Sequence, residues 1–209
     1  MVHKPRRTSA LLAAGWLLVP LAAAAQATDR FQPATPPELV ASLDAARALR
    51  QSQRYDESAE ALRRILAQAP DYYRAQYNLA LAYAQQGEHD KALEAFSRAA
   101  EIKEKMGIVD ASLENSIGWL HLLRGDLGAA ERHLQRALVE LAADAEADES
   151  TRRKVYNNLG TLYLYTGQLD LSRKYLETAK TQYGSALAAR SLELLGELQA
   201  KERTRREDG

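Results

Sequence analysis

Two stretches of this chain align residue for residue at a spacing of 34. In each stretch a small residue is followed by a bulky residue four positions later and by an apolar residue three positions further on. These positions are Ser58, Leu62 and Ile65 in the first stretch and Ala92, Phe96 and Ala99 in the second. A fixed period of roughly 20–50 residues predicts stacked copies of one supersecondary unit. Each copy buries its apolar face only against its neighbours, so a long surface stays free for a partner.

Two further copies follow, and both keep two small-residue positions. The first position is the second member of an apolar–small pair, and its small side chain lets two helices approach closely. The other is a glycine about seven residues later, which suits the left-handed conformation that ends a helix. The pairs are Leu79–Ala80, Ile117–Gly118 and Leu159–Gly160, and the glycines are Gly87, Gly125 and Gly167, spaced by 38 and 42 residues. Apolar residues within each copy recur at intervals of three and four, which predicts an all-α fold.

This pattern resembles the tetratricopeptide repeat (TPR), a two-helix unit, over about residues 38–184. The entry Tyr156–Asn157–Asn158 and the longer last spacing are similar to the long-helix repeats of kinesin light chain. The resemblance implies a right-handed superhelical α-solenoid of about four helix pairs, near 38–70, 72–105, 110–143 and 152–184. The first copy departs from the family pattern, with Ala45–Ala46 at the small pair and Gln53 at the turn. The resemblance also implies that helices pack through small residues at Ala80, Ala92, Gly118, Ala130, Gly160 and Ser172.

The N-terminus carries a second pattern. Lys4, Arg6 and Arg7 precede an apolar run over residues 10–25, and Ala25–Gln26–Ala27 then offers a small-x-small cleavage site. This arrangement predicts a secretory signal peptide over residues 1–27. The alternative is an uncleaved membrane anchor, because the run approaches the roughly 18 apolar residues that can span a bilayer. A cysteine-free helical repeat behind such a signal is typical of a bacterial periplasmic protein; with an uncleaved segment it would be anchored in the inner membrane.

Local composition predicts the structure of four other segments. Residues 28–37 contain Pro33, Pro36 and Pro37, which predicts an extended leader with few helical contacts. The acidic segment 142–150 is either a continuation of both flanking helices or, as we favour, a helix end followed by a short loop around 146–150. Residues 185–203 are amphipathic and predict a capping helix, the alternative being a dimerisation or docking helix. Residues 204–209 are charged and predict a disordered tail.

Composition excludes several classes of function. Loss of residues 1–27 would leave 25 basic and 28 acidic residues, a net charge of −3, so no general attraction to nucleic acid or anionic lipid is expected. Without cysteine there is no thiol chemistry and no zinc–thiolate site. The histidines are scattered, and His121 is expected to be a packed side chain. We therefore expect one domain with no catalytic residues, no metal and no cofactor, whose only membrane contact would be an uncleaved signal segment.

The resemblance implies that the first helix of each repeat lines a concave groove for a partner. Amides there suit the backbone of a bound peptide, and basic residues favour acidic side chains or a carboxylate. Trp119 is either an anchor for the partner or part of the wall between repeats. Ser112 and Ser116 break the carboxylate clamp of chaperone-binding TPR domains. The candidate partner-binding residues are Arg47, Arg74, Tyr77, Asn78, Asn115, Trp119, Lys154, Asn157 and Asn158.

Two functional hypotheses remain after these exclusions. The first is a non-catalytic scaffold or adaptor that binds a peptide or helix of another protein, in the assembly or maturation of a cell-envelope complex. The second is a structural module that associates with its own copies into a homo-oligomer. The sequence identifies neither the partner nor the pathway.

Overall fold

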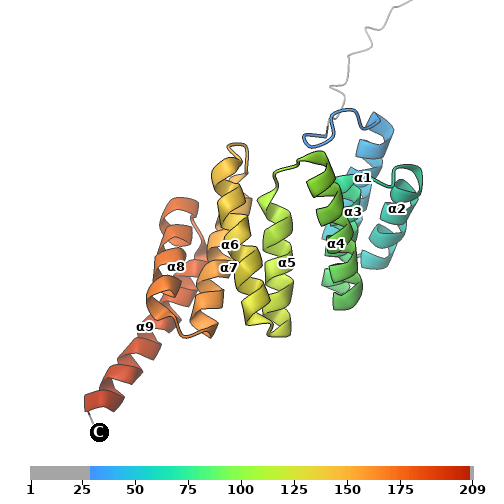
Figure 1. Cartoon of the computed structure of the whole chain (residues 1–209). Coiled ribbons are helices and arrows are strands. Elements are labelled where there is room, and N and C mark those ends of the chain that lie inside the picture. Colours follow the sequence, from blue (N-terminus) through green and yellow to red (C-terminus); the bar gives the residue numbers. More distant parts are fainter. Residues whose placement is uncertain (1–28, 208–209) are drawn as a thin grey trace, which may run out of the picture.

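The structure, a computed structural model, describes residues 29–207, so the predicted signal peptide lies outside the described residues. Within this range there are nine helices and no strand (Figure 1). They are α1 (Pro37–Gln51), α2 (Tyr55–Gln68), α3 (Tyr73–Gln86), α4 (His89–Met106), α5 (Ala111–Arg124), α6 (Leu127–Ala143), α7 (Glu149–Tyr165), α8 (Leu169–Tyr183) and α9 (Ala186–Glu207). Four successive helix pairs stack side by side and α9 follows them, which confirms the predicted all-α solenoid. None of the described helices is long and apolar enough to cross a bilayer.

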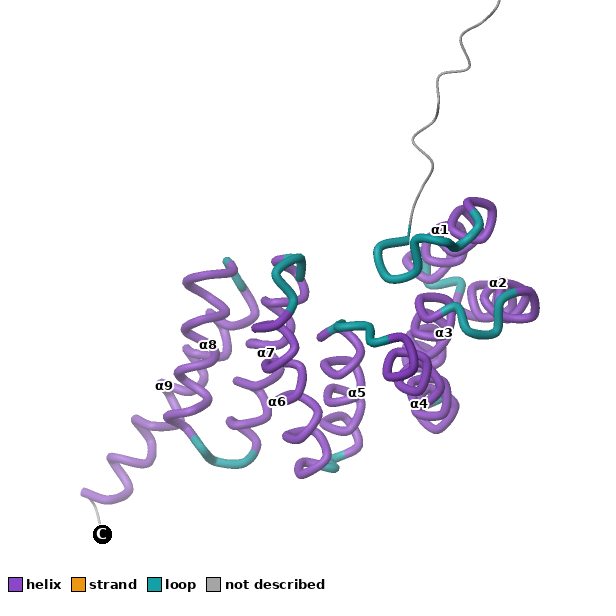
Figure 2. Tube along the Cα trace, turned by 45° about the horizontal axis from the view of Figure 1, so that its top comes forward, coloured by secondary structure: helices purple, strands orange, loops and turns teal. Residues whose placement is uncertain are grey.

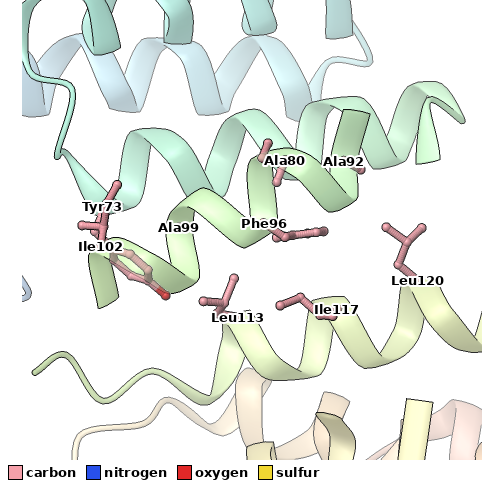
Figure 3. Close-up of a cluster of buried hydrophobic side chains, with 10 residues drawn as sticks. Tyr73, Ala80, Ala92, Phe96, Ala99, Ile102, Leu113, Ile117 and Leu120 are labelled. Carbon is pink, nitrogen blue, oxygen red and sulfur yellow. The ribbon is translucent and has the colours of Figure 1, made fainter. Parts of the chain in front are cut away.

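The hydrophobic core is shared between neighbouring repeats rather than enclosed within each one. In one cluster Tyr73 and Phe96, from the second repeat, pack with Leu113 and Ile117, from the first helix of the third (Figure 3). Similar clusters join the first repeat to the second and the third to the fourth. A repeat on its own would therefore leave part of this surface in water, which is why the units are stable only as a stack.

The predicted small positions lie where paired helices touch. Ala80, Ala92, Ala130 and Ser172 are fully buried. A Cβ atom on Gly118 would lie 2.7 Å from the Cγ atom of Leu134. Because no side chain fits at that distance without displacing a neighbour, residue size sets how closely the two helices of a pair approach.

The first repeat ends its first helix without glycine. Gln53 has φ +61°, the only non-glycine residue with positive φ among the described residues, and it occupies the turn where the second repeat has Gly87 at φ +82°. A side chain in this left-handed region costs roughly 1–2 kcal/mol. The departure seen in the sequence thus changes the residue at the turn while the turn itself is kept.

The leader differs from its prediction, because its side chains contact the start of the second repeat. Figure 2 shows the leader as a loop that precedes α1. Gln32 accepts a hydrogen bond from the backbone N–H of Tyr73 at 2.8 Å and donates one to the carbonyl of Asp71 at 2.8 Å. The ring of Phe31 meets that of Tyr73 edge-on, with 5.5 Å between centroids. The expectation of few helical contacts is therefore wrong, since polar side chains of the leader satisfy the backbone at the start of α3.

Two boundaries also differ from the sequence-based expectation. The loop between α6 and α7 covers residues 144–148, about two residues earlier than expected, because the side chain of Asp148 accepts the backbone N–H of Thr151 and so caps α7. At the other end α9 continues through Glu207, so residues 204–207 are helical instead of disordered. Its first half lies on the last repeat, with Ala188 and Leu195 fully buried, and its C-terminal half projects beyond α8 (Figure 1).

Candidate protein-binding groove

A cavity of about 340 Å³ is lined by the first helices of all four repeats together with the leader and the loop between α6 and α7. We call it the groove. It has five basic residues, Arg30, Arg47, Arg50, Arg74 and Lys154, and three acidic ones, Asp110, Asp144 and Asp148; the other lining residues are Phe31, Tyr77, Asn78, Leu81, Ser112, Ala147 and Thr151. Because successive first helices lie on the same side of a stacked array, residues about 110 positions apart in sequence meet here.

The structure brings five of the nine candidate partner-binding residues to the groove, namely Arg47, Arg74, Tyr77, Asn78 and Lys154. Burial raises the pKa of Tyr77 to about 12, so its phenol is neutral at physiological pH. The phenol contacts the hydroxyl of Ser116 at 3.0 Å. The amide nitrogen of Asn78 donates to the carbonyl of Arg74 in its own helix at 2.8 Å. The groove lining thus includes neutral, hydrogen-bonded side chains in addition to the charged ones.

The other four candidates lie elsewhere. Asn115 is buried and accepts a hydrogen bond from the amide nitrogen of Asn158 at 2.9 Å, so these two amides join α5 to α7. Asn157 is buried too, and its Oδ1 accepts the hydroxyl of Ser185 at 2.9 Å at the entry to α9. The expectation that Asn157 is exposed to a partner is wrong, because its side chain is buried in this contact with Ser185. Trp119 is exposed on α5, outside the groove lining.

The three carboxylates of the groove are already engaged. Asp144 pairs with Arg30 at 2.5 Å, and Asp148 caps α7. Asp110 accepts hydrogen bonds from the phenol of Tyr73 at 2.9 Å and from the backbone N–H of Ser112 at 2.8 Å. Of the basic residues, Arg30 pairs with Asp144, and Arg47 and Arg74 pair with Asp44 and Asp29, which lie outside the lining. Arg50 and Lys154 remain without an ion pair among the described residues.

Arg50 is the basic residue of the groove that has a buried donor nitrogen without an acceptor among the described residues. Its Nη1 donates to the neutral Oε1 of Gln85 at 3.0 Å, and its Nε is the single buried side-chain nitrogen or oxygen without a hydrogen-bond partner in the described part of the chain. Burial lowers the pKa of Arg50. No carboxylate of the described residues lies within ion-pair distance of Arg50 or of Lys154 on the opposite helix. A bound anion would stabilise such a guanidinium, because a partly buried charge costs free energy unless it is paired.

Sequence reasoning missed Arg30. Its guanidinium donates to the carbonyl of Glu146 at 3.0 Å as well as to Asp144, so the leader is joined to the loop between the third and fourth repeats. It also lies over the ring of Phe31, 4.4 Å from the centroid. No repeat position corresponds to Arg30, and a contact across 114 residues leaves no periodic signal that the sequence could have shown.

A second charged cluster lies away from the groove, beside a cavity of about 620 Å³ between α4 and the third repeat. Lys103 lies between Glu114 and Glu140, and His133 contacts Glu114 at 2.8 Å. His121 stacks on His133 with 5.5 Å between ring centroids, consistent with the packed side chain that was expected. Among the described residues no three histidine or carboxylate side chains are placed to hold a metal ion together.

Two family models described as tetratricopeptide repeat match the chain, one over residues 43–106 and the other over residues 154–183. This chain is a tetratricopeptide repeat protein. The first match spans α1 to α4 and the second covers most of α7 and α8, so the repeats recognised by family agree with the first, second and fourth helix pairs of the structure.

Solved TPR structures share the fold at low sequence identity. PilW, described as a type IV pilus biogenesis factor, superposes with a TM-score of 0.65 and 23% identity, covering 78% of this chain and 72% of PilW. BtubC from P. vanneervenii gives 0.61 and 20%, covering 69% of this chain and 62% of its own length, and Pseudomonas aeruginosa PilF gives 0.59 and 18%, covering 68% and 60%. The TPR protein thus spans less than two thirds of BtubC and PilF. No curated protein matches it in sequence.

Proposed function

We propose that this TPR protein is a non-catalytic scaffold that binds a segment of another protein in the groove. Tetratricopeptide repeats are in general interaction modules. The observation that carries the proposal is a lined cavity to which all four repeats contribute, in which Arg50 and Lys154 make no ion pair among the described residues and the buried Nε of Arg50 has no hydrogen-bond partner there. A folded chain gains nothing from gathering unpaired cations, since like charges repel, so the arrangement favours a partner that is absent when the protein is alone.

The groove is tested by site-specific photocrosslinking in the cells that make the protein. A photoreactive residue at Leu81, which lines the groove, is expected to crosslink one discrete partner. The same residue at Val139, which is exposed on α6 outside the groove, is the matched control and is expected to give none. Crosslinks at Val139 but not at Leu81 would move the binding surface to the second helices and contradict the proposal.

A charge reversal in the groove measures how much its positive charge contributes to binding. Lys154→Glu is expected to reduce crosslinking from Leu81 about fivefold, the effect of about 1 kcal/mol at a binding surface. Arg132→Glu, the same charge change on the exposed side of α6, is expected to leave the yield unchanged. Equal yields from both variants would show that the positive charge of the groove takes no part in binding.

The setting we propose is the assembly or maturation of a cell-envelope complex, with the protein in the periplasm. Support comes from the signal-like N-terminus and from the description of PilW, a structural neighbour, as a pilus biogenesis factor. Export is expected to remove residues 1–27, so intact-mass analysis of periplasmic protein should find a chain that begins at Thr28. Full-length chain in the membrane fraction would instead indicate the uncleaved anchor.

Self-association is a second candidate, favoured by α9. Leu187 is 60% exposed and Leu194 is 49% exposed on this helix, and its C-terminal half projects from the stack (Figure 1). Two such apolar stripes would bury each other in a dimer. Sedimentation analysis separates the candidates: a monomer at tens of micromolar supports the scaffold, whereas a dimer that Leu194→Lys dissociates supports the structural module.

A further inference from the structure

One arginine of the groove, Arg74, already pairs with a carboxylate of the chain itself, which lies outside the groove lining. Asp29 in the leader is fully buried, and its Oδ2 accepts the phenolic hydroxyl of Tyr72 at 2.8 Å. The same oxygen lies 3.4 Å from Nη1 of Arg74, a groove-lining residue. Its Oδ1 accepts the backbone N–H of Phe31 at 2.9 Å. An acidic side chain carried by a non-helical segment is thus bound here by an arginine and a neutral donor.

Arg50 is a second arginine of the groove, and it has no carboxylate partner among the described residues. It lines the same cavity as Arg74. Among residues 29–207 its one side-chain hydrogen bond is to the neutral Gln85, and its buried Nε has no acceptor. A guanidinium presents its donors in a planar fork that matches the two oxygens of a carboxylate. A carboxylate at this point would meet the hydrogen-bonding requirement of Nε and offset the cost of the buried charge.

The charges around Arg50 favour an acidic occupant over a neutral one. Five basic residues line the groove against three carboxylates, and those three are engaged with Arg30, with the start of α7, and with Tyr73 and Ser112. Lys154 on α7 adds a cation that makes no ion pair among the described residues, although its charge interacts with that of Asp148. An approaching acidic segment is therefore attracted, while a basic one is repelled.

We infer that the partner of the groove is an extended segment with an acidic side chain, whose carboxylate binds Arg50 as the carboxylate of Asp29 binds Arg74 and Tyr72. This inference rests on the proposed function, because it concerns the same groove. The side chain, rather than a chain terminus, is the source of the carboxylate, since the leader shows that mode in the molecule itself.

Blocked peptides test this directly with the purified mature protein. The probe is an acetylated and amidated peptide of four Gly-Glu units, and its match is four Gly-Gln units with the same blocked ends. The Glu peptide is expected to shift the nuclear magnetic resonance signal of the Arg50 Nε–H, and the Gln peptide is expected to leave it in place. A third peptide, Gly-Gln with a free C-terminal carboxylate, reports on binding of a chain terminus.

Two substitutions measure how much Arg50 contributes to the affinity for the Glu peptide. Arg50→Gln is expected to weaken the Glu peptide about tenfold, as for the loss of a hydrogen bond to a charged group. Arg64→Gln removes an exposed arginine that pairs with Glu60 on α2, outside the groove, and is expected to change the affinity less than twofold. Melting curves of both variants show whether the fold is kept. Equal affinity in parent and Arg50→Gln, preference for the free terminus, or no binding of the Glu peptide would each overturn the inference.

Failure here is distinguishable from failure of the proposed function. If Leu81 crosslinks a partner and Lys154→Glu lowers the yield, while the Glu peptide leaves the Arg50 signal unmoved, the groove binds protein by another chemistry. If Leu81 gives no crosslink either, the scaffold proposal itself fails.

Discussion

Gly160→Leu is expected to lower the free energy of unfolding by about 1–3 kcal/mol, the usual cost of overpacking a core. A Cβ atom on Gly160 would lie 2.6 Å from both Cγ and Cδ2 of Leu176, which is itself buried. The carbonyl of Gly160 also accepts the hydroxyl of Ser172 at 2.8 Å, so α7 and α8 would lose this hydrogen bond if they moved apart. Urea unfolding followed by circular dichroism measures the loss.

The matched control for this substitution is Gly196→Leu. Gly196 lies within α9, and a Cβ atom there would meet nothing within 4 Å. Leucine has a higher helix propensity than glycine, so the control is expected to be neutral or stabilising by up to about 1 kcal/mol. If both variants unfolded at the same urea concentration, close approach of the helices would not be what requires a small residue at position 160.

Lys103→Met is expected to cost about 3 kcal/mol, the low end of the range for removing one partner of a buried ion pair. The side chain of Lys103 is only 9% exposed, and its Nζ lies 2.5 and 2.6 Å from the two carboxylate oxygens of Glu140 and 3.8 Å from Glu114. Without the ammonium from the second repeat, the carboxylates of Glu114 and Glu140, both in the third repeat, lose the cation that lies between them. Thermal and urea unfolding at pH 7 give the magnitude.

The loss of stability in Lys103→Met is expected to become smaller as the pH is lowered. Burial raises the pKa of Glu140 above its usual value of 4.5, so ionised Glu140 is destabilising unless a cation compensates it. Lowering the pH from 7 towards 4.5 protonates Glu140 first in the folded state, and the deficit of Lys103→Met is expected to shrink over this window. The control is Lys105→Met, which breaks an exposed pair with Asp71 at 2.7 Å and is expected to cost about 0–1 kcal/mol at any of these pH values. A deficit that grew on acidification would contradict the assignment to Glu140.

The sequence by itself determined the helices, their pairing and their stacking. Apolar spacing decides where a helix buries its face, and residue size at Gly118 and Gly160 decides how closely two helices pack. Both properties depend only on nearby residues and recur in every copy, so each repeat supplies the same evidence for the fold again. The resemblance to the tetratricopeptide repeat implied that first helices would share one side, and the structure brings Arg47, Arg74, Tyr77, Asn78 and Lys154 into the groove.

Only the tertiary structure decided what each polar side chain does there. Asn157 and Asn158 are neighbours in the sequence, yet one bonds Ser185 at α9 and the other bonds Asn115 on α5. The leader looked extended from its prolines, but Gln32 bonds the start of α3 and Arg30 reaches Asp144. Such contacts join single residues far apart in the chain, and hydrogen-bond geometry, unlike hydrophobic period or residue size, is fixed only when the backbone has brought donor and acceptor together.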